Sequence, residues 1–482
     1  CFIFVLLDMR ADTPHLRPHC HFSPKRNWLN DPNGLVYHDG VYHMFYQYHP
    51  ANTQWGPMHW GHASSTNLID WQEEEVALAP DGNLLIFSGS VVIDVHNTSG
   101  LGTELQAPWV ALFTHHDMKA EKEQTHFAET QSLAYSLDHA KTWVKYPGNP
   151  VLGNPGERDF RDPKVFWHVA TQRWVMLLAV GDHVSFYHST DLTKWRKSGT
   201  FGALRGAQGG VWECPDLISM VCEDKVYWAL LVSLNPGGPA QGSGTQYFIG
   251  DFDGNSFSSS QTAVKWLDYG PDNYAGVTFH QVKDRHLMIA WMSNWLYAQL
   301  LPTHPWRGSM TVPRELHLRK VVQGTATELY LASLPAREFL SAGQEVQNME
   351  SDAAYLLSFH IDTAHSFSLG LSNELGESLQ LGYAHEKQQF FIDRRQAGVS
   401  HFSDNFASLY TAPRVSQTRI CPIQLLLDRS SLEFFADEGL SVLTTLMFPS
   451  APFKRLQLQC DAPEKIALHI RLLRSSEANP SD

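Results

Sequence analysis

The chain has 482 residues, a formal net charge of −14 and 12% aromatic residues, among them 15 Trp. This length exceeds what one hydrophobic core usually supports, so we expect two or more domains. The acidic balance argues against a nucleic-acid partner, because phosphate binding needs clustered Lys and Arg. No apolar run approaches the ~20 residues of a membrane-spanning helix, so we expect no membrane partner.

The N-terminal run Phe2–Leu7 (FIFVLL) fits the end of a signal-peptide core, and a buried N-terminal strand explains it equally well. Six cysteines are scattered without a CxxC pair, and Cys421 and Cys460 could pair because both lie in the C-terminal part. Histidine is frequent, with 25 residues, yet no HExxH or comparable ligand spacing occurs. We therefore expect no metal ion and no cofactor.

The first distinctive element is Trp28–Leu35 (WLNDPNGL), which places Asp31 directly before Pro32. Pro32 and Gly34 are strong turn formers, so this stretch predicts a turn that fixes the direction of the Asp31 carboxylate. A turn of this composition is also a common structural device. The motif becomes a candidate site only if it has partners elsewhere in the chain.

Two further acids stand shortly before a proline at the start of a strand-like run: Asp162 within Phe160–Pro163, and Glu213 within Trp212–Leu217. Proline is tolerated at the first residue of a strand, so both acids are expected at strand mouths. Three such carboxylates suggest glycoside hydrolysis, where one acts as nucleophile or base and another as acid. Arg161 should favour the ionised form of Asp162, unless the two form an ordinary ion pair.

Short strand-like runs separated by Gly, Pro, Asn and Asp dominate the chain, which indicates an all-β protein. Segments with a Ser/Asp turn end at Trp71, Trp143 and Trp195, with a weaker echo at Phe257. Their spacing of roughly 50 to 70 residues matches a four-stranded propeller blade with its loops. A fifth unit would run from Tyr269 through Trp295.

The innermost strands of a propeller converge on a central axis, which would bring Asp31, Asp162 and Glu213 together although they lie far apart in sequence. After Val312–Leu318 the pattern changes to alternating strands, with a hairpin predicted over Leu432–Leu440. A β-sandwich of about 130 residues is the natural interpretation of this part. We place the two domains at residues 1–335 and 336–482.

These motifs resemble glycoside hydrolase family 32, the group of invertases, inulinases and levanases. Three motifs occur in the same order as in the family: the heptad around Asp31, the Arg-Asp-Pro triplet at 161–163 and the Glu-Cys-Pro triplet at 213–215. Three further segments also match the family: Gln54–Gly56, Phe87–Ser90 and Val312–Leu316. The resemblance implies a five-bladed β-propeller followed by a C-terminal β-sandwich. It also implies cleavage at a terminal β-fructofuranosyl unit with retention of configuration.

The resemblance implies that Asp31 is the nucleophile, Glu213 the general acid and base, and Asp162 a transition-state stabiliser that binds fructose hydroxyls. Retention predicts that the carboxyl groups of Asp31 and Glu213 lie about 5 to 5.5 Å apart. The residues expected in the sugar pocket are Asn30, Gln47, Trp55, Phe87, Ser88, Arg161, Asp272 and Trp295. For Asp272 and Trp295 the alternatives are a turn acid and a core aromatic. Cys214 is more simply a buried filler than a nucleophile.

Three functions remain open at this point. The first is a β-fructofuranosidase that hydrolyses sucrose, and the second is an exo-acting fructanase that works on inulin or levan. The third, a non-catalytic sugar-binding protein, would predict a missing carboxylate, and none of the three is missing. A carbohydrate substrate of this class suggests a secreted protein, which we expect to be a monomer or a weak homo-oligomer.

Overall fold

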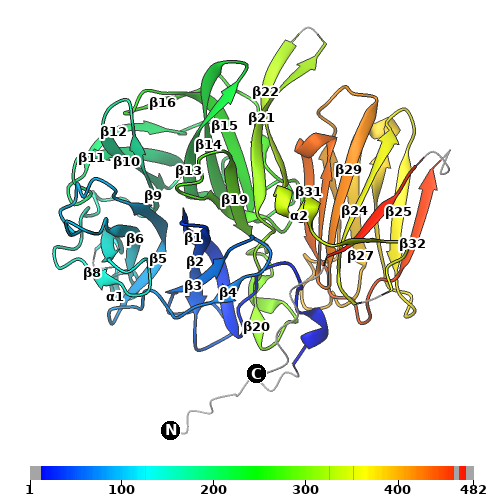
Figure 1. Ribbon diagram of the computed structural model, residues 1–482, viewed down its shortest axis with the longest axis horizontal. Coiled ribbons are helices and arrows are strands. Elements are labelled where there is room, and N and C mark those ends of the chain that lie inside the picture. Colours follow the sequence, from blue (N-terminus) through cyan, green and yellow to red (C-terminus); the bar gives the residue numbers. More distant parts are fainter. Residues whose placement is uncertain (1–11, 125, 325, 351, 461–465, 474–482) are drawn as a thin grey trace.

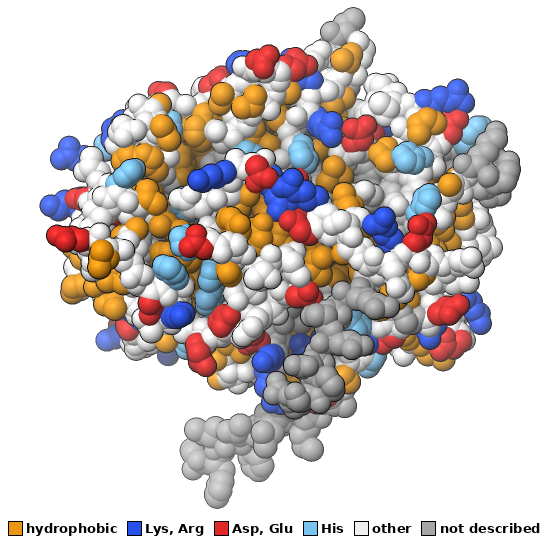
Figure 2. All heavy atoms as spheres, in the orientation of Figure 1, with side chains coloured by type: hydrophobic (Ala, Val, Ile, Leu, Met, Phe, Trp, Pro, Cys, Tyr) orange, Lys and Arg blue, Asp and Glu red, His pale blue; other side chains and the backbone are white. Residues whose placement is uncertain are grey.

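The computed structural model describes residues 12–124, 126–324, 326–350, 352–460 and 466–473, and nearly all of its elements are strands (Figure 1). The apolar run Phe2–Leu7 lies outside the described residues. Among the helices in the described ranges, none has the length and apolarity to cross a membrane. On the face in view, Lys and Arg side chains are interspersed with acidic ones (Figure 2).

Five sheets surround a common axis (Figure 1). Each is built from antiparallel strands in chain order, and the first sheet also has the short strand β20 (Trp306–Arg307), which pairs in parallel with its innermost strand. Blade I contains β1 (Asn27–His38), β2 (Val41–His49), β3 (His59–Ser65) and β4 (Gln72–Glu73). Blade II contains β5 (Leu84–Ile93), β6 (Trp109–Asp117), β7 (Glu129–Ser136) and β8 (Val144–Lys145), with α1 (Met118–Glu123) after β6. Blade III contains β9 (Arg161–His168), β10 (Arg173–Val180), β11 (His183–Ser189) and β12 (Arg196–Phe201).

Blade IV contains β13 (Val211–Cys222), β14 (Lys225–Asn235), β15 (Gly244–Phe252), β16 (Phe257–Ser258) and β17 (Lys265–Trp266). Blade V contains β18 (Tyr274–Thr278), β19 (His286–Trp291), β21 (Arg314–Gln323) and β22 (Ala326–Pro335). The innermost strands β1, β5, β9, β13 and β18 contact one another in turn, and β18 returns to β1. The ring is therefore a closed five-bladed propeller, as predicted.

The Ser/Asp-to-Trp repeat is the turn between the third and fourth strands of a blade, which confirms the repeat unit. Trp71 lies between β3 and β4, and Trp195 between β11 and β12. The two turns are alike in detail, because each indole Nε1 donates to a leucine carbonyl three residues back, Leu68 or Leu192. The fifth unit extends beyond its predicted end, since blade V runs to Pro335.

Each innermost strand carries a bulge near its N-terminal end, where two residues face a single residue of the second strand. The bulged pairs are residues 30–31, 87–88, 162–163, 214–215 and 275–276. The predicted turn at Trp28–Leu35 is therefore wrong, because the stretch is part of β1. Pro32 and Gly34 serve the strand: Pro32 follows the bulge, and a Cβ on Gly34, whose φ is +49°, would lie 2.6 Å from Val91 Cγ2.

The C-terminal part is a sandwich of two antiparallel sheets. One contains β23 (Gln344–Val346), β33 (His469–Leu473), β24 (Ala354–Asp362), β29 (Ile420–Asp428), β30 (Ser431–Ala436) and β31 (Ser441–Leu446). The other contains β28 (Leu409–Pro413), β27 (Gln389–Gln396), β26 (Ser378–Ala384), β25 (Phe367–Ser372) and β32 (Arg455–Cys460). The short helices are η1 (Pro14–Leu16), η2 (Ala298–Leu300), α2 (Arg337–Ser341), η3 (His385–Lys387) and η4 (Asp437–Gly439).

The hairpin predicted over Leu432–Leu440 is confirmed as β30, η4 and β31. The possible pairing of Cys421 with Cys460 is not formed, and both are free thiols. They lie in different sheets, with Cys421 on β29 and Cys460 on β32. The Cys421 sulfur instead accepts a hydrogen bond from the backbone N–H of Asp437 at 3.2 Å.

The edge strand β31 joins the sandwich to the propeller, beside which it lies in Figure 1. Tyr269 N–H donates to the carbonyl of Val442 at 2.8 Å, and Asp272 N–H to that of Thr444 at 3.3 Å. Between them the two backbones approach closely, since a Cβ on Gly270 would lie 2.2 Å from Thr444 N. The propeller segment thus continues the sandwich sheet at its edge.

A buried ionic network crosses the same interface. Arg314 of β21 donates to Glu433 of β30 and, at 2.9 Å, to Asp268, and all three side chains are at most 2% exposed. His21 links this network to Asp428: its Nε2 lies 2.9 Å from Glu433 and its Nδ1 2.8 Å from Asp428. The two carboxylates hold the imidazole as a cation, so the pKa of His21 lies well above its ordinary value of 6.5 despite complete burial.

Replacing His21 with Gln should lower the free energy of unfolding by about 3–5 kcal/mol, because two buried carboxylates lose their cation. Since the folded-state pKa is raised, the wild-type stabilisation is complete below pH 6.5 and is lost as pH rises through that higher pKa. Thermal unfolding across a pH series measures both effects. His360→Gln, at an exposed position of β24, is the control, and equal melting temperatures for the two variants would contradict the assignment.

Candidate active site

A cavity of about 860 Å³ lies where the bulged ends of the innermost strands meet. Ten of the predicted site residues line it: Asn30, Asp31, Gln47, Trp55, Phe87, Ser88, Arg161, Asp162, Glu213 and Trp295. The remaining wall comes largely from the connection between β6 and β7, which includes α1, and from the residues before β9. A cavity of this size and mixed polarity is typical of a small-ligand site.

Asp31 is held by donors on both carboxylate oxygens. Trp28 Nε1 donates to Asn30 Oδ1 at 2.7 Å, which turns the Asn30 amide so that Nδ2 donates to Asp31 Oδ1 at 3.1 Å. Ser88 Oγ donates to Oδ2 at 2.9 Å. Burial, together with the negative charge of Glu213, raises the pKa of Asp31 to about 6, although these donors oppose the shift.

Asp162 is only 6% exposed and has a positive φ of 62°, which is uncommon for a residue with a side chain. Its Oδ2 accepts from the backbone N–H of Cys214 at 2.9 Å. Burial is the main cause that raises the pKa of Asp162 to about 8, and Glu213 and Asp31 add to it. Arg161 acts in the predicted direction and favours the ionised form, but burial outweighs it.

Glu213 is held by a phenol and a guanidinium. Tyr274 donates its hydroxyl to Oε2, while Arg161 reaches Oε1 through Nε at 3.2 Å and Nη2 at 3.1 Å. Arg161 is in turn fixed by Glu129 at 3.1 Å and Asp159 at 2.8 Å. The rotation of the Glu213 carboxyl group is therefore set from two blades, III and V.

Cys214 connects the acids. Its sulfur lies 3.6 Å from Asp31 Oδ2 and 3.5 Å from Asp162 Oδ2, and it is fully buried at the bulge of β13. Burial beside three carboxylates raises the pKa of this thiol well above 9.0, so it stays protonated and can donate weakly to its neighbours. It therefore does more than fill space, but a thiol in this state is not a nucleophile.

Aromatic rings and one unpaired amide form the rest of the cavity wall. Phe87 stacks on His116 with ring centres 4.3 Å apart, and Trp295 stacks on Trp28 at 5.9 Å. Gln47 is 3% exposed, and its Nε2 has no hydrogen-bond partner among the described residues. Stacked rings beside a free donor suit a sugar, which presents both apolar faces and hydroxyl groups.

Asp272 does not belong to the cavity, so its predicted role in sugar binding is wrong. Its side chain is fully buried at the domain interface, where Arg394 Nη1 donates to Oδ2 at 2.6 Å. Tyr297 OH donates to Oδ1 at 2.6 Å and Leu446 N–H to Oδ2 at 2.8 Å. Arg394 and Leu446 belong to the sandwich and Tyr297 to the propeller, so Asp272 anchors the two domains to each other.

Sequence reasoning missed three residues that shape the site: Glu129, His116 and Tyr274. Glu129 is 2% exposed and accepts from the Phe160 backbone N–H at 2.6 Å, in addition to its contact with Arg161. Neither Glu129 nor His116 stands in a recognisable motif. Tyr274 could have been found, because it occupies the start of the fifth innermost strand, where the other blades carry site residues.

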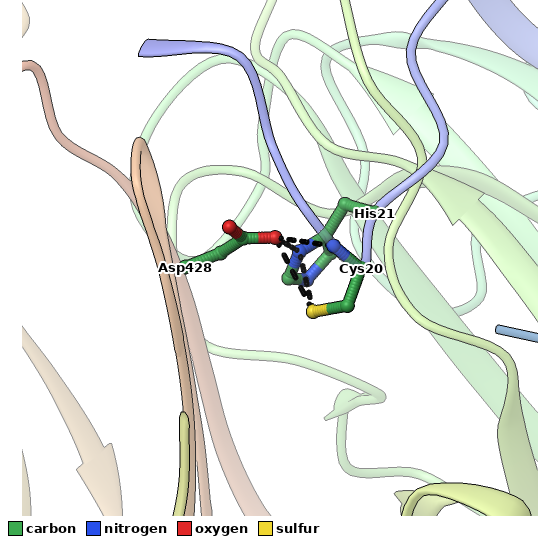
Figure 3. A group of neighbouring side chains, drawn as sticks. All are labelled: Cys20, His21 and Asp428. Carbon is green, nitrogen blue, oxygen red and sulfur yellow. Dashed lines mark hydrogen bonds and ion pairs between the residues drawn. The ribbon is translucent and has the colours of Figure 1, made fainter. Parts of the chain in front are cut away.

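One group of side chains in the described part of the chain has the spacing of a metal site: Cys20, His21 and Asp428, whose ligand atoms all lie within 4.8 Å of one another (Figure 3). The group lies outside the cavity. His21 has a carboxylate on each ring nitrogen, so both nitrogens donate and neither keeps a lone pair for a metal. We therefore interpret the group as a hydrogen-bonded link to the sandwich.

Comparison with known proteins agrees with this fold. The family model "Glycosyl hydrolases family 32 N-terminal domain" matches residues 21–331, and "Glycosyl hydrolases family 32 C terminal" matches residues 326–470. A levanase of Bacillus subtilis is 41% identical over 92% of this chain and 68% of its own length. An extracellular exo-inulinase of Aspergillus niger is 37% identical over 96% of each protein.

Two solved structures are similar over nearly their whole length. The exo-inulinase from Aspergillus awamori has a TM-score of 0.88 and 34% identity, with 96% of this chain and 99% of that chain covered. The fructofuranosidase from Schwanniomyces occidentalis, complexed with fructose, has a TM-score of 0.86 and 30% identity at the same coverage. The chain therefore belongs to glycoside hydrolase family 32 and is an enzyme that acts on carbohydrate.

Proposed function

We propose that the protein is a retaining, exo-acting β-fructofuranosidase that removes terminal β-D-fructofuranosyl units. The observation that carries the proposal is the convergence of Asp31, Asp162 and Glu213, from blades I, III and IV, on one cavity. Glu213 also lies near enough to Asp31 for its charge to raise the pKa of that carboxyl, which fits the closely spaced carboxyl pair of a retaining enzyme.

In the proposed first step, the Asp31 carboxylate attacks the anomeric carbon of the terminal fructosyl unit. The bond to the leaving oxygen breaks, and that oxygen takes the proton of Glu213. The product of this step is a fructosyl ester of Asp31. In the second step Glu213 takes a proton from water, the water oxygen attacks the same carbon, and the Asp31 carboxylate leaves.

The remaining contacts suit these roles. Asn30 and Ser88 hold the Asp31 oxygens, so little reorganisation is needed for attack. Burial raises the pKa of Asp162, which favours a protonated carboxyl group that can both donate to and accept from fructose hydroxyls. Gln47 supplies a free donor at the cavity wall.

An exo mode of action is supported by the closed centre of the propeller. Further along the innermost strands, Lys164 Nζ donates to Asp216 Oδ2 at 2.9 Å and to the Thr278 carbonyl at 2.8 Å. These contacts span β9, β13 and β18, and none of the three residues lines the cavity. A cavity closed on this side suits a terminal unit that is seated at the three acids, with the rest of the polymer outside.

The leaving group decides between sucrose and a fructan. The levanase and exo-inulinase relatives, which match almost the whole chain, favour an exo-fructanase, and sucrose carries the same terminal unit. Comparing kcat/KM for sucrose, inulin and levan separates the two candidates. The relatives named as extracellular support secretion of this protein, and we keep the monomer or weak homo-oligomer as our proposal for its assembly.

Asp31→Asn should reduce kcat by about 10⁴-fold or more, because the amide is not a competent nucleophile. Release of fructose from sucrose and inulin is the measurement, with far-ultraviolet circular dichroism to show that the variant is folded. Asp39→Asn, at an exposed position in the turn between β1 and β2 and outside the cavity, is the matched control and should keep most of the activity. Turnover by Asp31→Asn near the wild-type rate would refute the mechanism.

In a profile of kcat/KM against pH, the acid limb should have its midpoint near pH 6. Asp31 must be ionised to attack, and its pKa is about 6. Ser88 donates to the carboxylate and so favours the ionised form. Ser88→Ala should therefore move this limb to higher pH by about one unit. Ser90→Ala on the same strand is the control, since Ser90 Oγ contacts only backbone of blade III. A limb that stays in place in Ser88→Ala would rule out this assignment.

A further inference from the structure

Part of the cavity wall is formed by a propeller loop that contacts the sandwich. Between β19 and β20 (Trp306–Arg307), the propeller makes a loop over residues 292–305 that contains η2. Two residues of this loop, Trp295 and Gln299, line the cavity. Midway between them stands Tyr297, which is 1% exposed and points away from the cavity into the domain interface.

Arg394 of β27 binds Tyr297. Arg394 Nη2 donates to the Tyr297 hydroxyl at 2.9 Å, and the guanidinium carbon lies 5.3 Å from the centre of the tyrosine ring. Arg394 is 1% exposed and is itself fixed within the sandwich: Nε donates to the Phe406 carbonyl at 2.7 Å, and Nη2 to Tyr410 OH at 2.9 Å. The guanidinium group of Arg394 is therefore fixed in one position, and through Tyr297 it can restrict the position of the loop.

A second chain of contacts connects Arg394 to the same loop through Asp272. Arg394 Nη1 donates to Asp272 Oδ2, and the carbonyl of the preceding residue, Pro271, accepts from Asn294 Nδ2 at 2.9 Å. Asn294 directly precedes Trp295 and accepts the backbone N–H of Leu296 at 3.1 Å. Both routes end at residues adjacent to, or two away from, the cavity residues.

We propose that Arg394 is a positioning residue, through which the C-terminal sandwich sets the place of Trp295 and Gln299 in the substrate cavity. The proposal rests on the proposed function. Asp31 and Glu213 are held by contacts within the propeller, from Asn30, Ser88, Arg161 and Tyr274. Loss of the Arg394 contacts should therefore weaken binding of the substrate and leave the chemical step nearly intact.

Arg394→Met tests the proposal by the split between KM and kcat on inulin. We expect KM to rise roughly fivefold with kcat within about twofold of wild type, which is the pattern for lost uniform binding. Tyr297→Phe removes only the hydroxyl that joins Arg394 to the loop, and its KM should change in the same direction. The double variant should change KM no more than Arg394→Met alone, because both substitutions break one connection.

Thr444→Val is the matched control for a weakened interface. Thr444 Oγ1 belongs to the separate network of Arg314 and Asp268, so its loss should leave KM unchanged even if the melting temperature falls. If Arg394→Met does not fold, the KM of Tyr297→Phe tests the proposal on its own. Wild-type KM in a folded Tyr297→Phe variant, or an equal rise of KM in Thr444→Val, would overturn the proposal. An active Asp31→Asn would instead overturn the proposed function.

Discussion

The site depends on how the innermost strands of five blades, which meet around one axis, direct side chains into the same space. In this protein each innermost strand is broken by a bulge at the same level. A bulge places two consecutive residues opposite one, which re-aims a side chain that the pleat would otherwise send into the blade. Asp31, Ser88 and Asp162 are bulge residues that line the cavity, and the bulge residue Cys214 contacts two of the acids, so four of these bulges shape the site.

The bulges also explain the unusual residues at the site. Proline has no N–H to donate to a neighbouring strand, so it is tolerated at a bulge, where strand pairing is interrupted. Pro32 and Pro163 directly follow an acid, and Pro215 stands two residues after Glu213. Asp162, Cys214 and Ala275 have positive φ values of 62°, 47° and 55°, which side chains rarely adopt. Such backbone persists only when the surroundings over-determine it. Here the hydrogen bonds between neighbouring blades do so, as in the contact of Cys214 N–H with Asp162.

Burying three carboxylates together is costly, and the protein offsets this cost by proton binding and by one cation. Burial and mutual repulsion raise the pKa of Asp31 and of Asp162, so the group need not carry its full negative charge. Arg161 contacts Glu213, Glu129 and Asp159, and its pKa is raised well above the ordinary value by these acids. The same electrostatic arrangement makes Asp31, the proposed nucleophile, ionise at a pH closer to neutral than an ordinary carboxyl group does.

The propeller and the three acids leave local marks in the sequence, whereas the other cavity residues were expected from the resemblance to glycoside hydrolase family 32. The Trp-ended turns define blades, and the acid–proline motifs mark the innermost strands. Asp272 was misplaced because its partner, Arg394, lies 122 residues away in the other domain, and no local pattern records that contact. Glu129 and His116 were missed for the same reason. The turn predicted at Trp28–Leu35 failed because Pro and Gly have the same local signature in a bulged strand as in a turn.

The central claim is that Asp31 forms a covalent bond to fructose. Rapid acid quenching of the enzyme during turnover of inulin, followed by proteolysis and mass spectrometry, tests it directly. The account predicts that the peptide containing Asp31 gains the mass of one fructosyl residue, and that the gain disappears when substrate is exhausted. An adduct on a different peptide would contradict the account. So would the absence of any adduct during rapid turnover under conditions in which deglycosylation is rate-limiting.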